Sequence, residues 1–370
     1  MDALTTPSNW QKVRLGDIFF ITAGGDLSKP HYSNTKQSDF NYPIYSNAIE
    51  KKGLYGYSSF FIIKNKIITI TSRGTIGVAF FRDYPYVPIG RLLVLQPKIS
   101  NIDCRFYAEY INSKVKFNTE QTTIPQLTIP KVALCEIPLP PLNEQIAIAN
   151  VLSDVDRYLY SLDALILKKA GVKKALSFEL LSQRKRLKGF NQNWQRVRLG
   201  DICEIVKGQQ INKISLNNTD KYPVINGGID FLGYTNKFNV SKNTIAISEG
   251  GTCGYVRFMT SNFWSGGHNY SLQKISNKVN NLCLYHILKS YEKDIMKLGV
   301  GSGLKNIQLK ALKDFEILLP SLNEQIAIAN ILSDLDHEII SLKNKKRQFE
   351  NIKKALNHDL MSAKIRVLNK

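Results

Sequence analysis

Hydrophobic residues follow two different periods along this chain of 370 residues. In two long regions, short runs of β-branched and aromatic residues are separated by glycine, proline and asparagine, and residues 67–71 and 92–95 have the pattern of strands. Residues 106–112 and 282–291 have the pattern of short helices inside the same two regions. Each region is therefore predicted to be a mixed domain of helices and strands.

After each of these regions the apolar residues step by three and four, as in the seam of a coiled coil. We expect a long helix over residues 143–189 and another over 323–370, with Asn143 and Asn323 as N-caps and Gly189 ending the first. A helix of roughly 45 residues is about 65 Å long at ~1.5 Å per residue, so one small domain cannot bury its apolar stripe. The two helices are predicted to pair with each other, antiparallel because a domain lies between them in sequence. The predicted pair interface consists of Leu152, Val155, Leu159, Leu162, Leu332, Leu335, Ile339 and Leu342.

The chain contains an internal repeat. WQKVRLGDI at residues 10–18 returns as WQRVRLGDI at 194–202, with eight of nine positions identical. LNEQIAIANVLSDVD at residues 142–156 returns as LNEQIAIANILSDLD at 322–336, with thirteen of fifteen identical. The predicted organisation is one domain, one helix and a copy of each, over residues 1–142, 143–189, 190–322 and 323–370.

Between the shared blocks the two copies keep their glycines but differ elsewhere. TSRGTIG at residues 71–77 corresponds to SEGGTCG at 248–254, and GRLLVLQ at 90–96 corresponds to GHNYSLQ at 267–273. Two copies of one scaffold are thus predicted to carry two different surfaces.

Charge points to a polyanionic partner. The chain has 50 Lys and Arg against 30 Asp and Glu, a net charge of +20 and a pI near 9.6. Neutralising phosphates releases condensed counterions, so nucleic acid is the favoured partner, while a basic surface without this role or an acidic protein partner stays open. The many lysines and arginines of the two long helices fit either a solvated face or contact with phosphates.

No catalytic motif accompanies this charge. The sequence contains no GxxxxGK[ST] motif, no Asn/Asp-Pro-Pro-Tyr motif and no His/Cys/Cys deaminase zinc site, and its five cysteines form no CxxC pair. The cysteines are expected to be small buried residues, and Asp154, Asp156, Asp334 and Asp336 to be solvated helix residues rather than a metal site. No stretch approaches twenty apolar residues and no signal-peptide pattern opens the chain, so a cytoplasmic protein without a membrane partner is expected.

A variable domain followed by a long helix, present twice, resembles the specificity subunits of Type I restriction–modification systems. The most specific marks are LPPLNEQIAIANVLSDVD at residues 139–156 and LPSLNEQIAIANILSDLD at 319–336, together with the WxxVRLGDI domain starts. The resemblance implies an α+β fold: two mixed α/β target recognition domains, separated by two long antiparallel coiled-coil helices in a pseudo-twofold internal repeat.

The same resemblance implies a bacterial or archaeal subunit without catalysis of its own. Each domain would read one half of a split, asymmetric sequence in double-stranded DNA. The helices would act as a spacer and dock two methyltransferase subunits, with restriction subunits joining through the complex. S-adenosylmethionine, ATP and Mg²⁺ would serve adenine methylation and ATP-dependent cleavage in those partners, and none would bind this chain. The alternatives are a targeting subunit or scaffold of another methyltransferase-type complex, a nuclease with a cryptic site, or a protein-binding scaffold.

Two sets of site residues follow. Polar side chains in the loops that differ between the copies are candidates for DNA contact, because arginine pairs best with guanine and glutamine with adenine. They are Lys29, His31, Tyr32, Arg73, Thr75, Arg91, Lys207, Gln209, Gln210, Thr252, His268 and Asn269. The near-identical helix starts are candidates for partner docking, through Asn143, Glu144, Gln145, Asn323, Glu324 and Gln325. For the helix starts, a role in completing the domain fold is the alternative.

Overall fold

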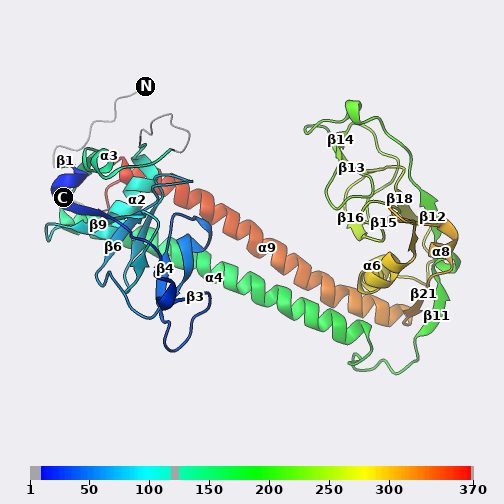
Figure 1. Ribbon diagram of the computed structural model, residues 1–370. Coiled ribbons are helices and arrows are strands. Elements are labelled where there is room, and N and C mark those ends of the chain that lie inside the picture. Colours follow the sequence, from blue (N-terminus) through cyan, green and yellow to red (C-terminus); the bar gives the residue numbers. More distant parts are fainter. Residues whose placement is uncertain (1–9, 118–124, 368–370) are drawn as a thin grey trace. The chain divides into compact units, whose positions relative to one another are not determined.

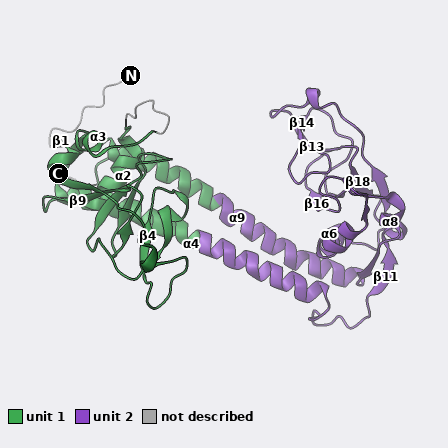
Figure 2. Ribbon diagram, viewed as in Figure 1, with its two compact units in different colours: residues 1–162, 345–370 green, residues 163–344 purple. Residues whose placement is uncertain are grey.

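The computed structural model describes residues 10–117 and 125–367 of the chain. It divides into two compact units, unit 1 with residues 1–162 and 345–370 and unit 2 with residues 163–344 (Figure 2). Each unit contains one α/β domain and part of both long helices, which are α4 (Leu142–Leu181) and α9 (Leu322–Met361) (Figure 1). Each long helix therefore gives its first part to the unit of its own domain and its last part to the other unit.

The domain of unit 1 consists, in chain order, of β1 (Gln11–Arg14), α1 (Leu15–Ile18), β2 (Phe19–Ala23), a 3-10 turn (Lys29–His31), β3 (Tyr32–Ser33), β4 (Tyr42–Tyr45), a 3-10 turn (Glu50–Gly53), β5 (Leu54–Ser58), β6 (Ile67–Ile70), β7 (Ala79–Arg82), β8 (Val87–Pro88), β9 (Leu93–Pro97), α2 (Cys104–Lys114), α3 (Ile129–Ala133) and β10 (Glu136–Leu139). Its main sheet is antiparallel in the order β2-β9-β6-β7. A second sheet has the order β3-β5-β4-β8, and β1 pairs with β10. Helix α2 packs on β6 and β7 and covers Ile68 and Ile70, and all four residues of β6 are buried.

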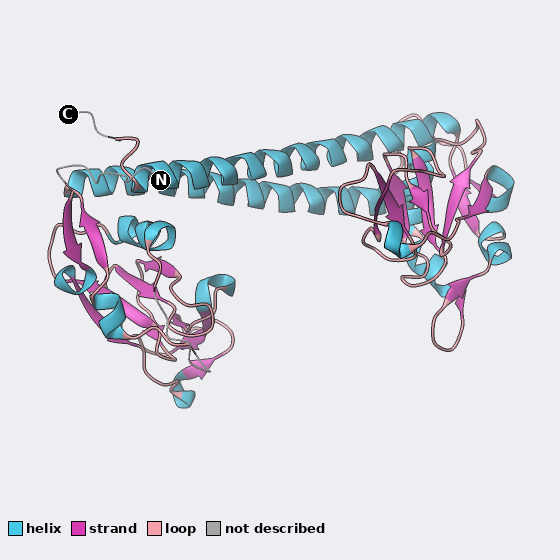
Figure 3. Cartoon of the chain, turned by 90° about the horizontal axis from the view of Figure 1, so that it is seen from above, coloured by secondary structure: helices cyan, strands magenta, loops and turns pink. Residues whose placement is uncertain are grey.

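The domain of unit 2 consists of β11 (Gln195–Arg198), α5 (Leu199–Ile202), β12 (Glu204–Lys207), a 3-10 turn (Lys213–Ser215), β13 (Tyr222–Ile225), β14 (Gly233–Thr235), β15 (Thr244–Ser248), β16 (Val256–Met259), β17 (Trp264–Ser265), β18 (Asn269–Gln273), α6 (Asn281–Ser290), α7 (Glu292–Lys297), β19 (Gly299–Val300), β20 (Asn306–Ile307), α8 (Leu309–Lys313) and β21 (Glu316–Leu319). Its main sheet, β12-β18-β15-β16, repeats that of unit 1, and the domain has three further sheets, β14-β13-β17, β11-β21 and β19-β20. Both domains combine strands with short helices (Figure 3). The predicted strands and short helices are confirmed as β6, β9, α2 and α6.

Each domain has one main core that also takes in both long helices. In unit 1, Trp10, Ile68 and Phe106 pack in one cluster with Leu152 of α4 and Leu360 of α9. In unit 2 the equivalent cluster joins Trp194, Ile245 and Leu284 to Leu332 of α9 and Leu181 of α4. Each core therefore includes the last turns of the long helix that follows the other domain. Burial of these turns contributes hydrophobic stabilisation to each unit.

Ion pairs and ring contacts confirm the predicted antiparallel pairing of α4 and α9 within each unit. In unit 1, Lys353 Nζ lies 2.7 Å from an Asp156 carboxylate oxygen, and the rings of Tyr158 and Phe349 lie 4.6 Å apart. In unit 2, the equivalent ion pair joins Lys173 and Asp336 at 2.5 Å. Asp156 and Asp336, expected to be solvated, are thus bound to lysines of the neighbouring helix.

The long helices are shorter than predicted, with 40 residues each instead of roughly 45, or about 60 Å at ~1.5 Å per residue. They begin at Leu142 and Leu322, where the carbonyls of Pro141 and Ser321 accept the first backbone bonds, so Asn143 and Asn323 lie inside the first turn and are not N-caps. Helix α4 ends eight residues before the expected stop at Gly189, and α9 ends nine residues before the expected end at 370, because Gln183 and Ala363 adopt φ of +59° and +52°. A left-handed residue directs the chain out of the helix and lets its N–H bond the last turn.

The five cysteines are unpaired, as expected. Cys104, Cys203 and Cys283 are buried, and burial raises the pKa of each thiol to about 12. Cys135 and Cys253 are only half-buried, so the expectation that all five are buried is wrong for these two.

Candidate nucleic-acid interface

In unit 1 four loops meet at one end of the main sheet, and we call them the unit 1 loop cluster: residues 24–31, 46–53, 71–78 and 89–92. Side-chain and backbone bonds connect them. Asn47 Nδ2 donates to the carbonyl of Gly90 at 2.6 Å, and Asn47 Oδ1 accepts from the Ser72 N–H at 2.8 Å. Ser72 Oγ in turn donates to the Arg91 carbonyl at 2.6 Å. Asn47 therefore fixes the spacing of the loops that carry Arg73 and Arg91.

The unit 2 loop cluster consists of residues 208–212, 226–232, 249–255 and 266–268. It has the same backbone frame as the unit 1 loop cluster. The equivalent N–H to carbonyl bonds are Gly24 to Leu92 (2.7 Å) and Gly208 to Asn269 (2.8 Å), Gly77 to Thr71 and Gly254 to Ser248 (2.8 Å each), and Leu127 to Ser72 and Ile307 to Glu249 (2.9 Å each). Because these bonds use only the backbone, the side chains on the loops can differ without changing the frame.

The structure brings most of the predicted contact residues of unit 1 into its loop cluster or beside it. Lys29, His31, Arg73, Thr75 and Arg91 are exposed, and only Tyr32 is half-buried. His31 Nδ1 lies 2.7 Å from Ser59 Oγ, and Arg73 Nη2 donates to Gln126 Oε1 at 3.3 Å. His31 and Arg73 are thus positioned by polar neighbours, and among residues 10–117 and 125–367 no carboxylate forms an ion pair with Lys29, Arg73 or Arg91.

In unit 2 the predicted residues divide into three groups. Gln209, Gln210 and His268 are exposed in the loop cluster, and Thr252 is half-buried. Lys207 is exposed, but its Nζ lies 2.6 Å from Glu249 Oε1. The prediction for Asn269 is wrong, because this residue is 1% exposed and lies inside β18 opposite Ser248. A buried strand residue cannot reach a base edge.

Glu249 is a residue of the unit 2 loop cluster that the sequence did not single out. It is 8% exposed, accepts from Tyr270 Oη at 3.3 Å as well as from Lys207, and lies 3.8 Å from His268 Nδ1. Burial and the adjacent carboxylate raise the pKa of Tyr270 to about 12. The available signal was the single acidic residue of SEGGTCG, at the position of Ser72 in TSRGTIG.

The partner-docking prediction is wrong for Glu144, Gln145, Glu324 and Gln325, because all four are at most 3% exposed. Trp10 Nε1 donates to Glu144 Oε2 at 3.1 Å, and Arg366 Nε lies 2.6 Å from Glu144 Oε1. Unit 2 repeats this arrangement with Trp194, Glu324 and Arg186, at 3.2 and 2.9 Å. Each of these Trp–Glu–Arg triads joins a domain start, a helix start and the segment that follows the other long helix.

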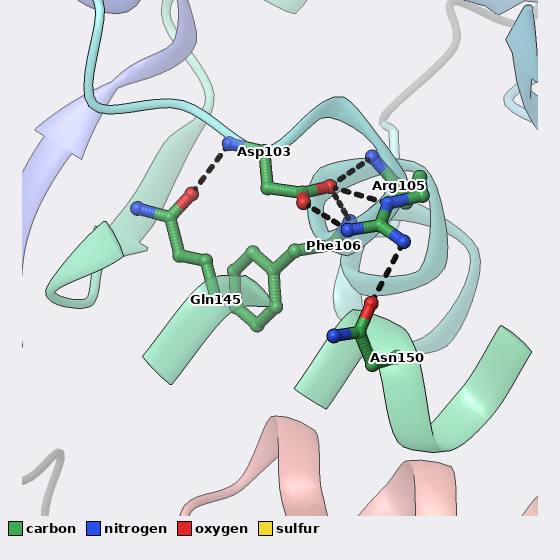
Figure 4. A network of polar contacts seen from close by, with 5 residues as sticks. All are labelled: Asp103, Arg105, Phe106, Gln145 and Asn150. Atoms are coloured by element: carbon green, nitrogen blue, oxygen red, sulfur yellow. Dashed lines mark hydrogen bonds and ion pairs between the residues drawn. The ribbon is translucent and has the colours of Figure 1, made fainter. Parts of the chain in front are cut away.

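The glutamine of each repeated LNEQ segment also forms hydrogen bonds inside the fold. Gln145 accepts from the Asp103 N–H at 2.9 Å, and its Nε2 donates to the Pro140 carbonyl at 2.8 Å (Figure 4). Asp103 caps α2 and binds Arg105, which also donates to Asn150 of α4 at 2.9 Å. In unit 2, Gln325 makes the corresponding bonds to Asn280 and Pro320. Glutamate and glutamine thus complete the domain fold, which was the alternative interpretation.

Other identical residues of the blocks remain accessible. Asn143, Ile146 and Asn150 are exposed on α4, and their copies Asn323, Ile326 and Asn330 are exposed on α9. The eight predicted residues of the helix-pair interface are buried or half-buried. Among residues 10–117 and 125–367, no group of three or more His, Cys, Asp or Glu could hold a metal ion, and no described helix is long and apolar enough to cross a membrane.

Comparisons with known proteins agree with this architecture. The family model of the Type I restriction modification DNA specificity domain matches residues 7–169 and 191–351. A putative Type I restriction enzyme specificity subunit of Methanocaldococcus jannaschii is 31% identical over 411 residues, which cover 98% of this chain and 95% of that protein. A putative Type I specificity subunit of Mycoplasma pneumoniae is 38% identical over 165 residues, 42% of this chain and 44% of its own length. With that relative and one from Mycoplasma genitalium at 40%, the chain shares less than half of their length.

The fold also has a solved counterpart. The crystal structure of a Type I restriction–modification S subunit from M. genitalium covers 97% of this chain and 99% of its own, with a TM-score of 0.72 and 21% identity. Two copies of one α/β domain, each followed by a long helix, define a duplicated specificity-domain protein. The chain belongs to the Type I restriction–modification DNA specificity family, and the predicted resemblance and fold class are confirmed.

Proposed function

We propose that this chain reads a bipartite, asymmetric DNA sequence, with one half recognised by each loop cluster. The observation that carries the proposal is the shared backbone frame with different exposed side chains, Arg73 and Arg91 in unit 1 against Gln209, Gln210 and His268 in unit 2. Arginine favours guanine and glutamine favours adenine, so two unlike clusters favour two unlike half-sites. The net charge of +20 supplies the attraction to phosphates that holds the register.

The exposed residues of the repeated blocks support docking of two methyltransferase subunits. Burial explains why glutamate and glutamine are identical in both copies, but it does not explain the identity of exposed Ile146 and Ile326, which are 37% and 41% exposed. Exposed positions farther along the helices have diverged, for example Tyr160 and Ile340. Two identical surfaces on one chain fit two copies of one partner.

A hollow beside the first of the two repeated helix starts favours the same assignment. In unit 1 it has a volume of about 830 Å³ and is lined by Ile146, Ile99 and Phe81 among others. In unit 2 a hollow of about 340 Å³ is lined by residues that include Ile275 and Asn281, and no residue of 322–336 is among its lining residues. The concave, partly apolar surface next to Ile146 suits the side chains of a docking partner.

In this proposal the chain acts without a catalytic site and works in the bacterial or archaeal cytoplasm. Adenine methylation with S-adenosylmethionine belongs to the methyltransferase subunits, and ATP- and Mg²⁺-dependent cleavage belongs to restriction subunits. The two long helices act as the spacer between half-sites.

Methylation mapping by sequencing tests the reading of DNA. In cells that carry this chain and its methyltransferase, the expected methylated motif has two different specific halves around a non-specific gap. A continuous or symmetric motif would contradict the proposal.

A mass measurement of the purified complex tests the docking. Ile146→Asp and Ile326→Asp should each remove one methyltransferase, and the double variant should remove both. Tyr160→Asp is the matched control at an exposed position that differs between the copies, and it should leave two subunits bound. One methyltransferase per wild-type chain at saturation would overturn the assignment.

A further inference from the structure

The loop of residues 46–53 in the unit 1 loop cluster contains two consecutive lysines in a strained conformation. Lys51 and Lys52 have φ/ψ of +48°/+31° and +56°/+32°. This left-handed region is open to glycine but is rarely adopted by residues with side chains. Gly53, with φ of +81°, follows them, so the chain has glycine at one of three adjacent left-handed positions and lysine at the other two. Strain kept in this way marks candidate functional positions.

A buried arginine holds this loop from below. Arg82 of β7 is 1% exposed, and its Nη2 donates to the Lys52 carbonyl at 2.5 Å. Its Nε donates to Thr69 Oγ1 at 3.2 Å, and the guanidinium lies 3.7 Å from the centre of the Tyr45 ring. Within the described part of the chain, Arg82 makes no ion pair and its Nη1 has no hydrogen-bond partner. An uncompensated positive charge therefore lies beneath the two lysines.

The lysines are exposed on the same surface as other cations. Asn47 of this loop is bonded to Ser72 and Gly90, the neighbours of Arg73 and Arg91. Among residues 10–117 and 125–367, no carboxylate forms an ion pair with any of these four cations. The four loops of this cluster contain five Lys and Arg against Asp26 and Glu50, so their net charge is positive and favours a polyanion.

The equivalent loop of unit 2 has the same kind of tether but no lysines. Arg257 of β16 donates through Nη2 to the carbonyls of Gly228 and Ile229, at 2.6 Å each. The tip of this loop, residues 228–232, has the sequence GIDFL, and its Ile229 and Phe231 are 55% and 47% exposed. Tethering is thus common to both units, whereas the pair of left-handed lysines is specific to unit 1.

We propose that Lys51 and Lys52 form a preset phosphate clamp, through which unit 1 holds the DNA backbone beside its half-site. This inference rests on the proposed function. Lysine binds phosphate as a point charge, and a loop fixed in advance by Arg82 loses less conformational entropy on binding than a free loop. Unit 2 has an apolar loop tip at this position, so its phosphate contacts come from elsewhere.

Salt-dependent DNA binding tests the clamp without knowledge of the target sequence, because phosphate contacts do not depend on sequence. The probe is a labelled 30-base-pair duplex of mixed sequence, titrated with the full chain between 50 and 200 mM KCl. In the double variant Lys51→Gly/Lys52→Gly, the slope of log K against log salt should fall by about 1.8, at ~0.9 per lost contact. The affinity ratio of wild type to variant should then be about tenfold larger at 50 mM than at 200 mM.

Two controls separate charge from structure. Glycine accepts positive φ, so the double glycine variant should have a Tm equal to or above that of the wild type. Lys51→Gln/Lys52→Gln removes only the charges and should give the same change of slope. Lys12→Ala, an exposed lysine on β1 away from the loop clusters, removes a charge and should leave the slope unchanged.

An unchanged slope in both double variants, with wild-type DNA binding still steeply salt-dependent, would overturn the clamp and leave the proposed function intact. The clamp would also be overturned if Lys12→Ala lowered the slope as much per charge, because the effect would then come from net charge alone. Failure of the wild-type chain to bind the duplex at 50 mM salt would instead count against the proposed function.

Discussion

Beside the loop clusters, the two domains fill equivalent positions with side chains of opposite character. By strand register, the equivalent pairs are Tyr45 and Ile225, Thr69 and Ala246, Arg82 and Met259, and Tyr86 and Phe263. In unit 2 these residues form an apolar cluster, whereas in unit 1 they surround a buried guanidinium. Burial raises the pKa of Tyr45 and Tyr86 above the ordinary range, and the charge of Arg82 opposes part of that increase.

This difference shows which parts of the domain are free to diverge. The main cores take in the same elements in both units, although their residues differ, as with Phe19 and Cys203, and the backbone frame of the loop clusters is shared. The small cluster supports only its own loops, so its chemistry has changed together with them. A new reading surface therefore needs new support beneath the loops but keeps the strand order of the main sheet.

The first prediction, with the largest change in stability, places an arginine in the apolar cluster of unit 2. Met259→Arg would bury a cation among Ile225, Val240 and Phe263, without the ring and hydroxyl that Arg82 contacts. We expect unit 2 to lose more than about 4 kcal/mol and to unfold below the transition of unit 1. Trp194 and Trp264 report on unit 2 in a fluorescence melt, and Met259→Leu should stay within about 1.5 kcal/mol of the wild type. A single melt at the wild-type temperature would contradict the comparison.

A second prediction concerns the Trp–Glu–Arg triads, which are present in both units. Arg186→Ala leaves the buried carboxylate of Glu324 without its ion pair and should cost about 3 kcal/mol in urea unfolding. Arg366→Ala should cost somewhat less, because the Arg366 side chain is 37% exposed against 25% for Arg186. If only one of the two variants lost stability, the Trp–Glu–Arg triads would not be equivalent.

The third prediction concerns pH. Burial and the charge of Lys173 lower the pKa of His286 from 6.5 to about 4, while Asp336 acts in the opposite direction. Because the unfolded chain binds this proton first, unit 2 should lose stability as pH falls from 6.5 towards 4 and then level off. The loss approaches about 3 kcal/mol, at 1.36 kcal/mol per pKa unit.

Unit 1 has Glu109 at the position of His286, and it lies 3.6 Å from Lys353. The histidine titration should therefore be confined to unit 2. The measurement is urea unfolding of unit 2 at several pH values, with His286→Gln as the variant that removes this part of the slope. An equal slope in that variant would exclude His286 as its source.

The last prediction, with the smallest change in stability, replaces the residues around the buried guanidinium of unit 1 with their equivalents from unit 2. Thr69→Ala/Arg82→Met replaces a buried charge and its hydroxyl partner with apolar residues, and such exchanges are often neutral or stabilising. We expect the free energy of unfolding to stay within about 1 kcal/mol of the wild type. A loss above 3 kcal/mol would mean that the polar contacts of Arg82 are essential to the fold.

The repeat in the sequence was enough to predict the two domains, the antiparallel helices and most of the loop residues. The repeat did not predict which polar residues are buried. Glu144 and Gln145 were predicted to form a docking surface because they are identical in both copies. Identical residues are also required where a polar group is hydrogen-bonded inside the fold. Asn269 was placed in a loop because strand ends are uncertain by a few residues. Arg82 and Glu249 were missed, because no periodicity signals a single charged residue buried by distant parts of the chain.

In the proposed function, the two loop clusters read two half-sites independently. The most direct measurement is the methylated motif in cells that carry the methyltransferase and a hybrid chain, in which residues 20–135 come from another family member. We expect a motif with one half changed and the other half unchanged, because unit 2 keeps its loop cluster intact. A motif changed in both halves would contradict it.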